Sequence, residues 1–212
     1  MAIKPILFNS HMVRAILDGR KTVMRRAVKG LENYDDFCVL GTDHDMLAAK
    51  KNGDEYPKRV KGLWAIFDWL FRDGLIHSRI EKAPYAPGDV LWVRETWAQV
   101  NGVYYYRADD QENLGVFGGW CPSTQMPRDA ARIWLRVTNV SVERLQDIDE
   151  AGAEAEGGKV RILKCSPSRT ARDDFALIWD GTIKPTDYNR YGWEANPWVW
   201  VIEFERCEKP EQ

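Results

Sequence analysis

Alternating apolar side chains recur along this chain, and the segment from Trp198 to Phe204 shows the pattern most clearly. A large apolar side chain occupies every second position there, with smaller or charged side chains between. Because successive side chains of a strand point to opposite sides of a sheet, this alternation predicts a β-strand. Similar patterns and turn signals predict strands over residues 5–8, 23–28, 76–80, 90–97, 103–107 and 132–144. The last of these should bend near Asn139, where the parity of the apolar positions changes.

Helical patterns are fewer. Val13, Ile16 and Leu17 would share one face of a helix over residues 10–18, and Gly19 follows where a helix end favours a left-handed residue. Two further helices are predicted over residues 147–156 and 171–179. Because strands outnumber helices and hairpin turns join several of them, the sequence predicts an α+β fold. Its expected core is a mostly antiparallel β-barrel with helices packed at its ends.

The stretch from residue 30 to 62 is rich in Asp, Lys, Gly and Asn and has no clear periodicity. The aromatic run over residues 63–71 fits either a strand or a short helix. A chain of 212 residues has room for one domain that carries an insertion. We therefore expect a single domain over residues 1–212, with the insertion at about residues 30–80.

The net charge of −2 does not indicate a polyanion-binding protein, so a site for nucleic acid would have to be local. Residues 19–29 form such a local patch, since they contain no acid and five basic residues, Arg20, Lys21, Arg25, Arg26 and Lys29. A basic patch beside a helix end is suited to a phosphate. On charge alone, a solvated basic turn is the favoured interpretation.

Four cysteines are widely spaced, with no CxxC pair, which is typical of reduced thiols in a cytosolic protein. The sequence predicts no metal site and no cofactor, because the three histidines have no partners at ligand spacing. The N-terminus does not resemble a signal peptide, and no apolar run is long enough to span a bilayer. We expect a cytoplasmic protein without a membrane partner.

Short motifs over most of the chain carry a family resemblance. They are KPILF (4–8), GRKT (19–22) with Arg25 and Arg26, PGD (87–89) with LWVRETW (91–97), MPR (126–128), LQDI (145–148), AEG (155–157) and NPWVWVIEF (196–204). With these motifs the chain resembles the ASCH superfamily, and in particular the ASCH proteins of phages and prophages. The resemblance implies a PUA-like β-barrel and a cleft for RNA or a nucleoside.

The resemblance also implies candidate catalytic residues. One family member hydrolyses the acetyl amide of N4-acetylcytidine with a Lys, a Thr and a Glu, and another member is a ribonuclease. The Lys corresponds to Lys21 and the Glu to Glu156, but the Thr corresponds to Met24, which has no hydroxyl. Thr22 is the nearest hydroxyl in the sequence, so Lys21, Glu156 and Thr22 are the catalytic candidates. Met24 argues against amidohydrolase activity.

Recognition of RNA bases requires aromatic faces beside a positive groove. The candidates for this role are Arg20, Arg25, Arg26, Arg94, Trp92, Trp97, Tyr106 and Trp193. The alternative for the aromatic residues is core packing, and for Arg94 it is an ion pair in the barrel. Lys21 could equally be a surface lysine, and Glu156 a carboxylate at a helix end. If Lys21 instead binds RNA, Lys21→Ala should weaken binding without unfolding the protein.

Three functions remain open from the sequence. The first is an RNA- or nucleoside-binding domain, and the second is a hydrolase that acts on RNA or a modified nucleoside. The third is a phage accessory protein that binds a host protein through a Trp-rich surface. Whether Lys21 and Glu156 approach each other in one cleft, with a hydroxyl beside them, distinguishes the first of these functions from the second. A flat, exposed aromatic patch without a cleft would favour the third.

Overall fold

The computed structural model of the chain describes residues 1–32, 34, 36–41, 47–51, 54–58, 62–70, 76–109, 119–160 and 169–211. In chain order the strands and α-helices are β1 (Ile3–Leu7), α1 (Ser10–Leu17), β2 (Val23–Ala27), β3 (Asp36–Gly41), β4 (Leu47–Lys51), β5 (Asp54–Lys58), β6 (Trp64–Leu70), β7 (Ile76–Lys82), β8 (Val90–Arg94), β9 (Trp97–Val100), β10 (Val103–Tyr106), β11 (Trp134–Arg144), α2 (Glu150–Ala155), α3 (Ala171–Asp180), α4 (Tyr188–Tyr191) and β12 (Trp198–Cys207). The predicted α+β class is confirmed.

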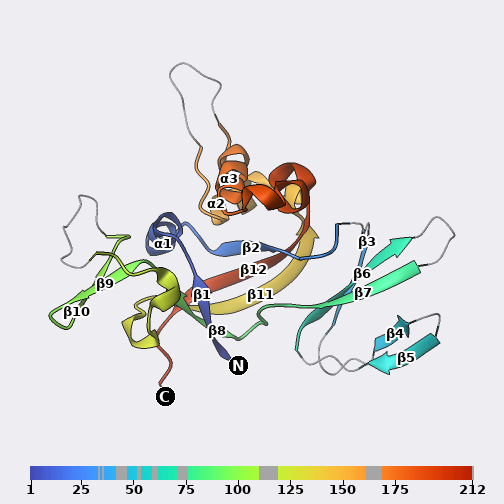
Figure 1. The fold of residues 1–212 in the computed structure, drawn as a ribbon, viewed down its shortest axis with the longest axis horizontal. Coiled ribbons are helices and arrows are strands. Elements are labelled where there is room, and N and C mark those ends of the chain that lie inside the picture. Colours follow the sequence, from blue (N-terminus) through green and yellow to red (C-terminus); the bar gives the residue numbers. More distant parts are fainter. Residues whose placement is uncertain are drawn as a thin grey trace.

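A five-stranded sheet in the order β1-β8-β11-β12-β2 forms the centre of the molecule (Figure 1). The β1–β8 pair is parallel, and the other three pairs in this sheet are antiparallel. Within the described residues the sheet is open, with β1 and β2 as its two edges, and no closed barrel is formed. The long strand β11 is irregular where the sequence predicts a bend, because its register against β12 shifts between Val137 and Asn139.

The two faces of β12 belong to two different cores, as its alternating sequence predicts. Trp198, Trp200, Ile202 and Phe204 are buried in the main core, together with residues of β1, α1 and β8. Val199 and Val201 pack instead against α2 and α3. Figure 1 shows these two helices together on one side of the sheet. The sheet therefore packs against α2 and α3 on one face and against residues of α1 and the segment 65–67 on the other.

The predicted strand over residues 90–97 is divided into β8 and β9. The interruption falls at Glu95, whose amide donates to the Met126 sulfur at 3.2 Å and whose buried carboxylate accepts two bonds from Arg132. These contacts replace the ladder hydrogen bonds that would continue the strand. The predicted hairpin partner over residues 103–107 consequently pairs with β9 alone, across the turn at Asn101 and Gly102.

The predicted insertion contains strands of its own. The sheet β3-β6-β7 and the hairpin β4-β5 extend to one side of the main sheet (Figure 1). Within the ambiguous run over residues 63–71, Trp64–Leu70 form a strand, β6, and its Ala65 and Phe67 are fully buried in the main core. The Phe67 ring lies 5.6 Å from that of Trp198, measured between centroids. β6 thus joins the insertion to the central sheet.

The helix predicted over residues 147–156 begins later, at Glu150, after a 3-10 turn over residues 145–147. Asp149 caps it by accepting a hydrogen bond from the Gly152 amide at 2.7 Å. In the described part of the chain, no helix is long and apolar enough to cross a membrane.

Candidate functional site

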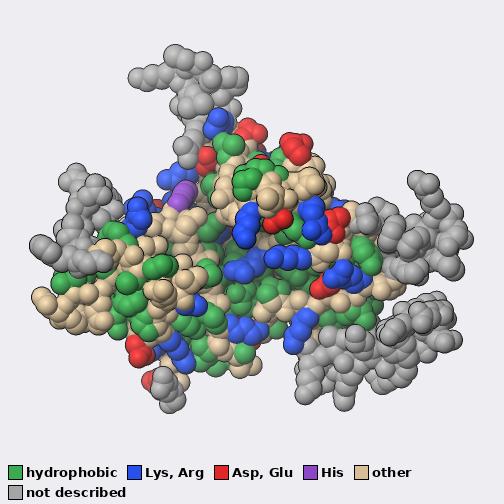
Figure 2. Space-filling model, in the orientation of Figure 1, with side chains coloured by type: hydrophobic (Ala, Val, Ile, Leu, Met, Phe, Trp, Pro, Cys, Tyr) green, Lys and Arg blue, Asp and Glu red, His purple; other side chains and the backbone are tan. Residues whose placement is uncertain are grey.

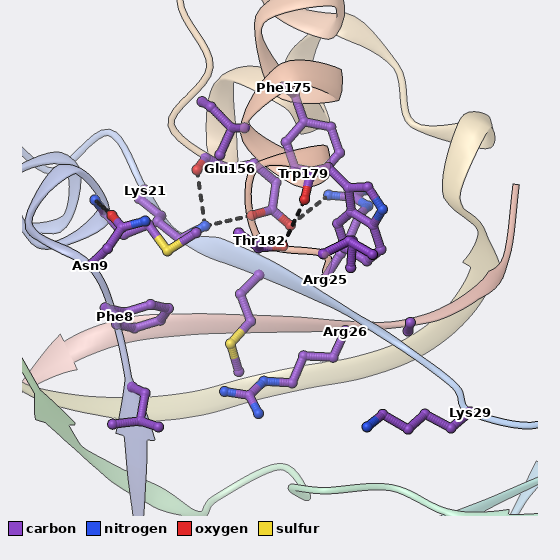
Figure 3. A pocket seen from close by; sticks show the side chains of 16 residues that line it. Phe8, Asn9, Lys21, Arg25, Arg26, Lys29, Glu156, Phe175, Trp179 and Thr182 are labelled. Atoms are coloured by element: carbon purple, nitrogen blue, oxygen red, sulfur yellow. Dashed lines mark hydrogen bonds and ion pairs between the residues drawn. The ribbon is translucent and has the colours of Figure 1, made fainter. Parts of the chain in front are cut away.

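A cleft of about 460 Å³ lies at the free edge of β2, bordered by β1 and α1 on one side and by α3 on the other. Its apolar walls include Phe8, Met12, Met24, Phe175, Ile178 and Trp179. Its charged lining consists of Lys21, Arg25, Arg26, Lys29 and Glu156. Figure 3 shows Lys21, Arg25 and Glu156 on one side of the β2 ribbon and Phe8 and Arg26 on the other. The cleft therefore extends around the strand edge.

The end of α1 carries Lys21 into the cleft. Gly19 adopts a positive φ of 74° directly after the helix, and the amides of Arg20 and Lys21 both donate to the Ala15 carbonyl, at 2.9 and 3.0 Å. The side chain of Lys21 then turns inward, and the residue is only 2% exposed. Lys21 is not a surface lysine.

The ammonium group of Lys21 is fully engaged. Its Nζ donates to the Val23 carbonyl at 2.8 Å, to the Glu156 carbonyl at 2.9 Å and to Glu156 Oε2 at 2.5 Å. A lysine ammonium has three hydrogens and no acceptor, so these three bonds use its whole capacity. In this arrangement Lys21 has no donor left for a ligand.

Glu156 occupies the C-cap position of α2 and is 6% exposed. A carboxylate is disfavoured at the C-terminal end of a helix, where the helix dipole is negative. Two cations compensate, since Lys21 binds one carboxylate oxygen and Arg25 Nη1 donates to the other at 3.3 Å. Arg25 also donates from Nε to Glu143 at 2.7 Å. The four side chains form a chain of alternating charge with no net charge.

The positive character of the cleft therefore depends on Arg26 and Lys29. Within the described residues neither side chain has a carboxylate partner, and the Arg26 guanidinium lies 5.8 Å from the ring centre of Tyr85. Burial raises the pKa of the Tyr85 hydroxyl, and Arg26 partly opposes that shift. Figure 2 shows Lys and Arg side chains gathered over β2, below α3. Arg26 and Lys29 are therefore the two cations of the cleft that can bind an anion.

The cleft unites four of the predicted site residues, Lys21, Glu156, Arg25 and Arg26. Thr22 is exposed at the start of β2 and does not line the cleft. Arg20 donates to Asp18 at 3.0 Å and to the Gly157 carbonyl at 3.3 Å, also outside it. Of the five basic residues in the patch, four line the cleft, and Arg20, which precedes β2, does not.

The predicted aromatic residues lie elsewhere. Trp92, Trp97 and Tyr106 pack against a third cluster around Val90, Met126 and Trp134, whereas their strand neighbours Leu91 and Val93 face the main core. The Arg94 guanidinium lies 5.4 Å from the ring centre of Trp92, and among the described residues it has no carboxylate partner of the kind considered from the sequence. Since alternate residues of β8 face opposite sides of the sheet, this cluster lies across the sheet from the main core.

Trp193 is also outside the cleft. It packs edge-on against Phe175, with 6.2 Å between ring centres, and Arg172 lies 5.1 Å from its ring centre. The aromatic surface of the cleft comes instead from Phe8, at the end of β1, and from Phe175 and Trp179 of α3. Phe8 ends the KPILF motif, directly before the α1 N-cap Asn9, and this position is the only feature of the sequence that points to Phe8 as a site residue.

The hydroxyl that the cleft offers is that of Thr182, just after α3. It donates to the Trp179 carbonyl at 2.7 Å and lies on the same side of β2 as Glu156 and Arg25 (Figure 3). No feature of the sequence indicates Thr182 or Glu143, the ion-pair partner of Arg25. Thr182 reaches the site through the packing of α3, and Glu143 through that of β11. In the described parts of the chain no group of three or more His, Cys, Asp or Glu side chains is placed to hold a metal ion.

Comparisons of the chain with protein-family models, with curated proteins and with solved structures return no match.

Proposed function

We propose that the protein binds RNA or a nucleoside in the cleft at the edge of β2, as an ASCH-type domain of the phage and prophage kind with a PUA-like fold. The observation that carries the proposal is the meeting of Lys21 and Glu156, 135 positions apart in the chain, within this cleft. These are the two positions at which the family resemblance implies functional residues. Two unpaired cations stand beside them.

The chemistry of the cleft supports such a ligand. Its volume of about 460 Å³ falls within the range of small-molecule sites, roughly 300–1,000 Å³. Arg26 and Lys29 can bind a phosphate, while Phe8 and Trp179, each 5% exposed, line the cleft with the open part of an aromatic ring. Lys21 and Glu156 line the same cleft and are held in place by their ion pair.

The test is the salt dependence of binding to a short single-stranded RNA, measured by fluorescence anisotropy. If Arg26 and Lys29 each meet one phosphate, the double variant Arg26→Gln/Lys29→Gln should bind more weakly. Its plot of log K against log salt should be shallower by about 1.4, since one contact on a single strand contributes about 0.7. The matched control is Arg136→Gln/Lys184→Gln, which removes two exposed cations outside the cleft. Salt-independent binding, or no binding by the wild type at low salt, would contradict the proposal.

A second candidate is a hydrolase that acts on RNA or a modified nucleoside through Lys21 and Glu156. The observation that favours it is the Thr182 hydroxyl in the same cleft. Against it, Lys21 has no free position to act as a base, and Met24 occupies the position of the family Thr. Binding therefore remains the first proposal. Turnover of N4-acetylcytidine by the purified protein, followed by chromatography of the products, would distinguish the two.

A further inference from the structure

We propose that the free backbone edge of β2, at Arg25 and Ala27, reads the hydrogen-bonding edge of a nucleobase in the cleft. The inference rests on the proposed function and adds to it how a base is recognised. Arg26 and Lys29 would hold the phosphate, and the backbone would hold the base.

The orientation of the backbone groups follows from the pairing of β2 with β12. The Phe204 amide donates to the Thr22 carbonyl at 2.8 Å, and the Val28 amide donates to the Trp198 carbonyl at 2.8 Å. Hydrogen-bonded and non-hydrogen-bonded pairs alternate along an antiparallel ladder. The pairs Met24–Ile202 and Arg26–Trp200 therefore continue the hydrogen-bonded series.

The intervening residues of β2, Val23, Arg25 and Ala27, turn their N–H and C=O groups away from β12. The Lys21 ammonium confirms this direction, since it binds the Val23 carbonyl from the outer side. β2 is the last strand of its sheet, and both Arg25 and Ala27 line the cleft. Within the described residues, the outward N–H and C=O groups of these two residues have no hydrogen-bond partner.

A nucleotide fits this edge better than an added peptide strand does. Lys21 occupies the edge at Val23, which leaves two outward-facing residues about 6.8 Å apart along the strand. A paired strand typically has about five or six residues, so this edge is too short for one. The edge presents donors and acceptors in alternation, and a base likewise carries donors beside acceptors on its Watson–Crick edge. The unpaired cations Arg26 and Lys29 complement a phosphate, which a peptide lacks.

Ala27→Pro tests the backbone contact. Proline removes the N–H of residue 27 but no ladder bond, because that N–H points away from β12, and edge strands tolerate proline there. Arg26 is already extended in β2, as a residue before proline should be. Ala27→Val is the matched control, since it adds bulk but keeps the N–H. Melting curves of both variants establish that they are folded.

The probes are the four nucleoside 5′-monophosphates and ribose 5-phosphate, with affinities measured by calorimetry. We expect at least one nucleotide to bind the wild type more tightly than ribose 5-phosphate. Ala27→Pro should lower the affinity for that nucleotide about three- to tenfold, the effect of one hydrogen bond, and should not change the affinity for ribose 5-phosphate. Ala27→Val should bind both compounds as the wild type does. If no nucleotide binds more tightly than ribose 5-phosphate, or if Ala27→Pro weakens both equally, the inference is wrong.

Amide hydrogen exchange gives a second test that needs no variant. In the free protein the amides of Arg25 and Ala27 should exchange quickly, and those of Met24 and Arg26 slowly. The tightest-binding nucleotide should slow Ala27 or Arg25, and no change at either amide would overturn the inference. The contact of Arg26 and Lys29 with the phosphate is tested separately, by loss of binding in Arg26→Gln/Lys29→Gln. Failure of that double variant to alter binding would instead count against the proposed function itself.

Discussion

Lys21 donates all three of its ammonium hydrogens to groups inside the protein, two carbonyls and one carboxylate. The sequence indicates that Lys21 belongs to a basic patch but not that it is buried, because burial arises from α2, which lies far along the chain. The expectation that Lys21→Ala spares the fold therefore changes. Removing Lys21 would leave Glu156 buried beside Arg25 alone, so stability and binding should fall together.

The variant Lys21→Met measures that contribution. It keeps the apolar length of the side chain but removes the charge, and breaking a buried pair from one side costs about 3–5 kcal/mol. Urea unfolding should show a loss of this size. Lys29→Met, at an exposed position of the same cleft, should stay within about 0.5 kcal/mol of the wild type. Equal, small effects in both variants would mean that the Lys21–Glu156 pair adds little.

Met24 is the other decisive residue, since it lines the cleft where the family resemblance implies a Thr. Groups that act as a unit in catalysis fail together, so the wild type should hydrolyse N4-acetylcytidine poorly or not at all. Met24→Thr should restore a trace of activity if Lys21 and Glu156 are correctly placed. Wild-type turnover on the order of 1 per second would show that Met24 does not block catalysis. The hydroxyl of Thr182 would then be the group to replace, as Thr182→Val.

Among the elements, β1 is held beside β8 by a parallel ladder and by the buried carboxylate of Asp89. Asp89 accepts hydrogen bonds from the Ala2 amide at 2.8 Å, from Lys4 Nζ at 2.7 Å and from the Ala86 amide at 3.1 Å. Burial by itself would raise the pKa of Asp89, but these hydrogen bonds outweigh it and hold the pKa below the ordinary value of 3.8. The ionised form of Asp89 therefore stabilises the folded state.

This shift predicts an acid-sensitive contribution to stability. Because the folded pKa of Asp89 lies below the unfolded one, its contribution is present above pH 3.8 and is lost as the pH falls through the lower folded value. Asp89→Asn should cost about 1.5–3 kcal/mol at pH 7. The difference from the wild type should shrink in denaturant titrations at progressively lower pH below 3.8. A difference that stays constant with pH would contradict this assignment.

The elements were more predictable from the sequence than their arrangement. Periodicity and caps locate α1, α3 and β12 to within a few residues, because these signals are local. The division of the strand at Glu95 was not predictable, since it depends on Met126 and Arg132 from another segment. Closure of a barrel likewise depends on contacts between strands distant in sequence, and the described strands form an open sheet.

For the molecule as a whole, the same limit explains the placement of the predicted aromatic residues. The sequence predicts Trp92 beside the same positive groove as Lys21, but strand order decides which side chains meet. β8 and β2 are separated in the sheet by β11 and β12, and Trp92 faces the third cluster. Lys21 and Glu156 could be paired in advance only through the family resemblance, since nothing in their spacing brings them together.

The insertion should unfold together with the central sheet, because Phe67 is 0% exposed and packs on Trp198. Phe67→Ala should lower the free energy of unfolding by about 3–5 kcal/mol. Tryptophan fluorescence and circular dichroism should still follow one common transition in denaturant. Leu177→Ala, at an exposed position of α3, is the control. Two separate transitions in the wild type would show that the insertion is an independent unit.

The recessed position of β2 has a consequence for the protein in a crowded solution. An open strand edge is a template on which a second copy of a chain can add, and such growth leads to aggregates. Here α1 and α3 border the edge, and Lys21 closes one end of it. The groups that remain open, at Arg25 and Ala27, form too short an edge for a strand of another molecule to pair along it. We therefore expect the protein to resist edge-to-edge polymerisation through β2 even at concentrations at which an uncovered edge would aggregate.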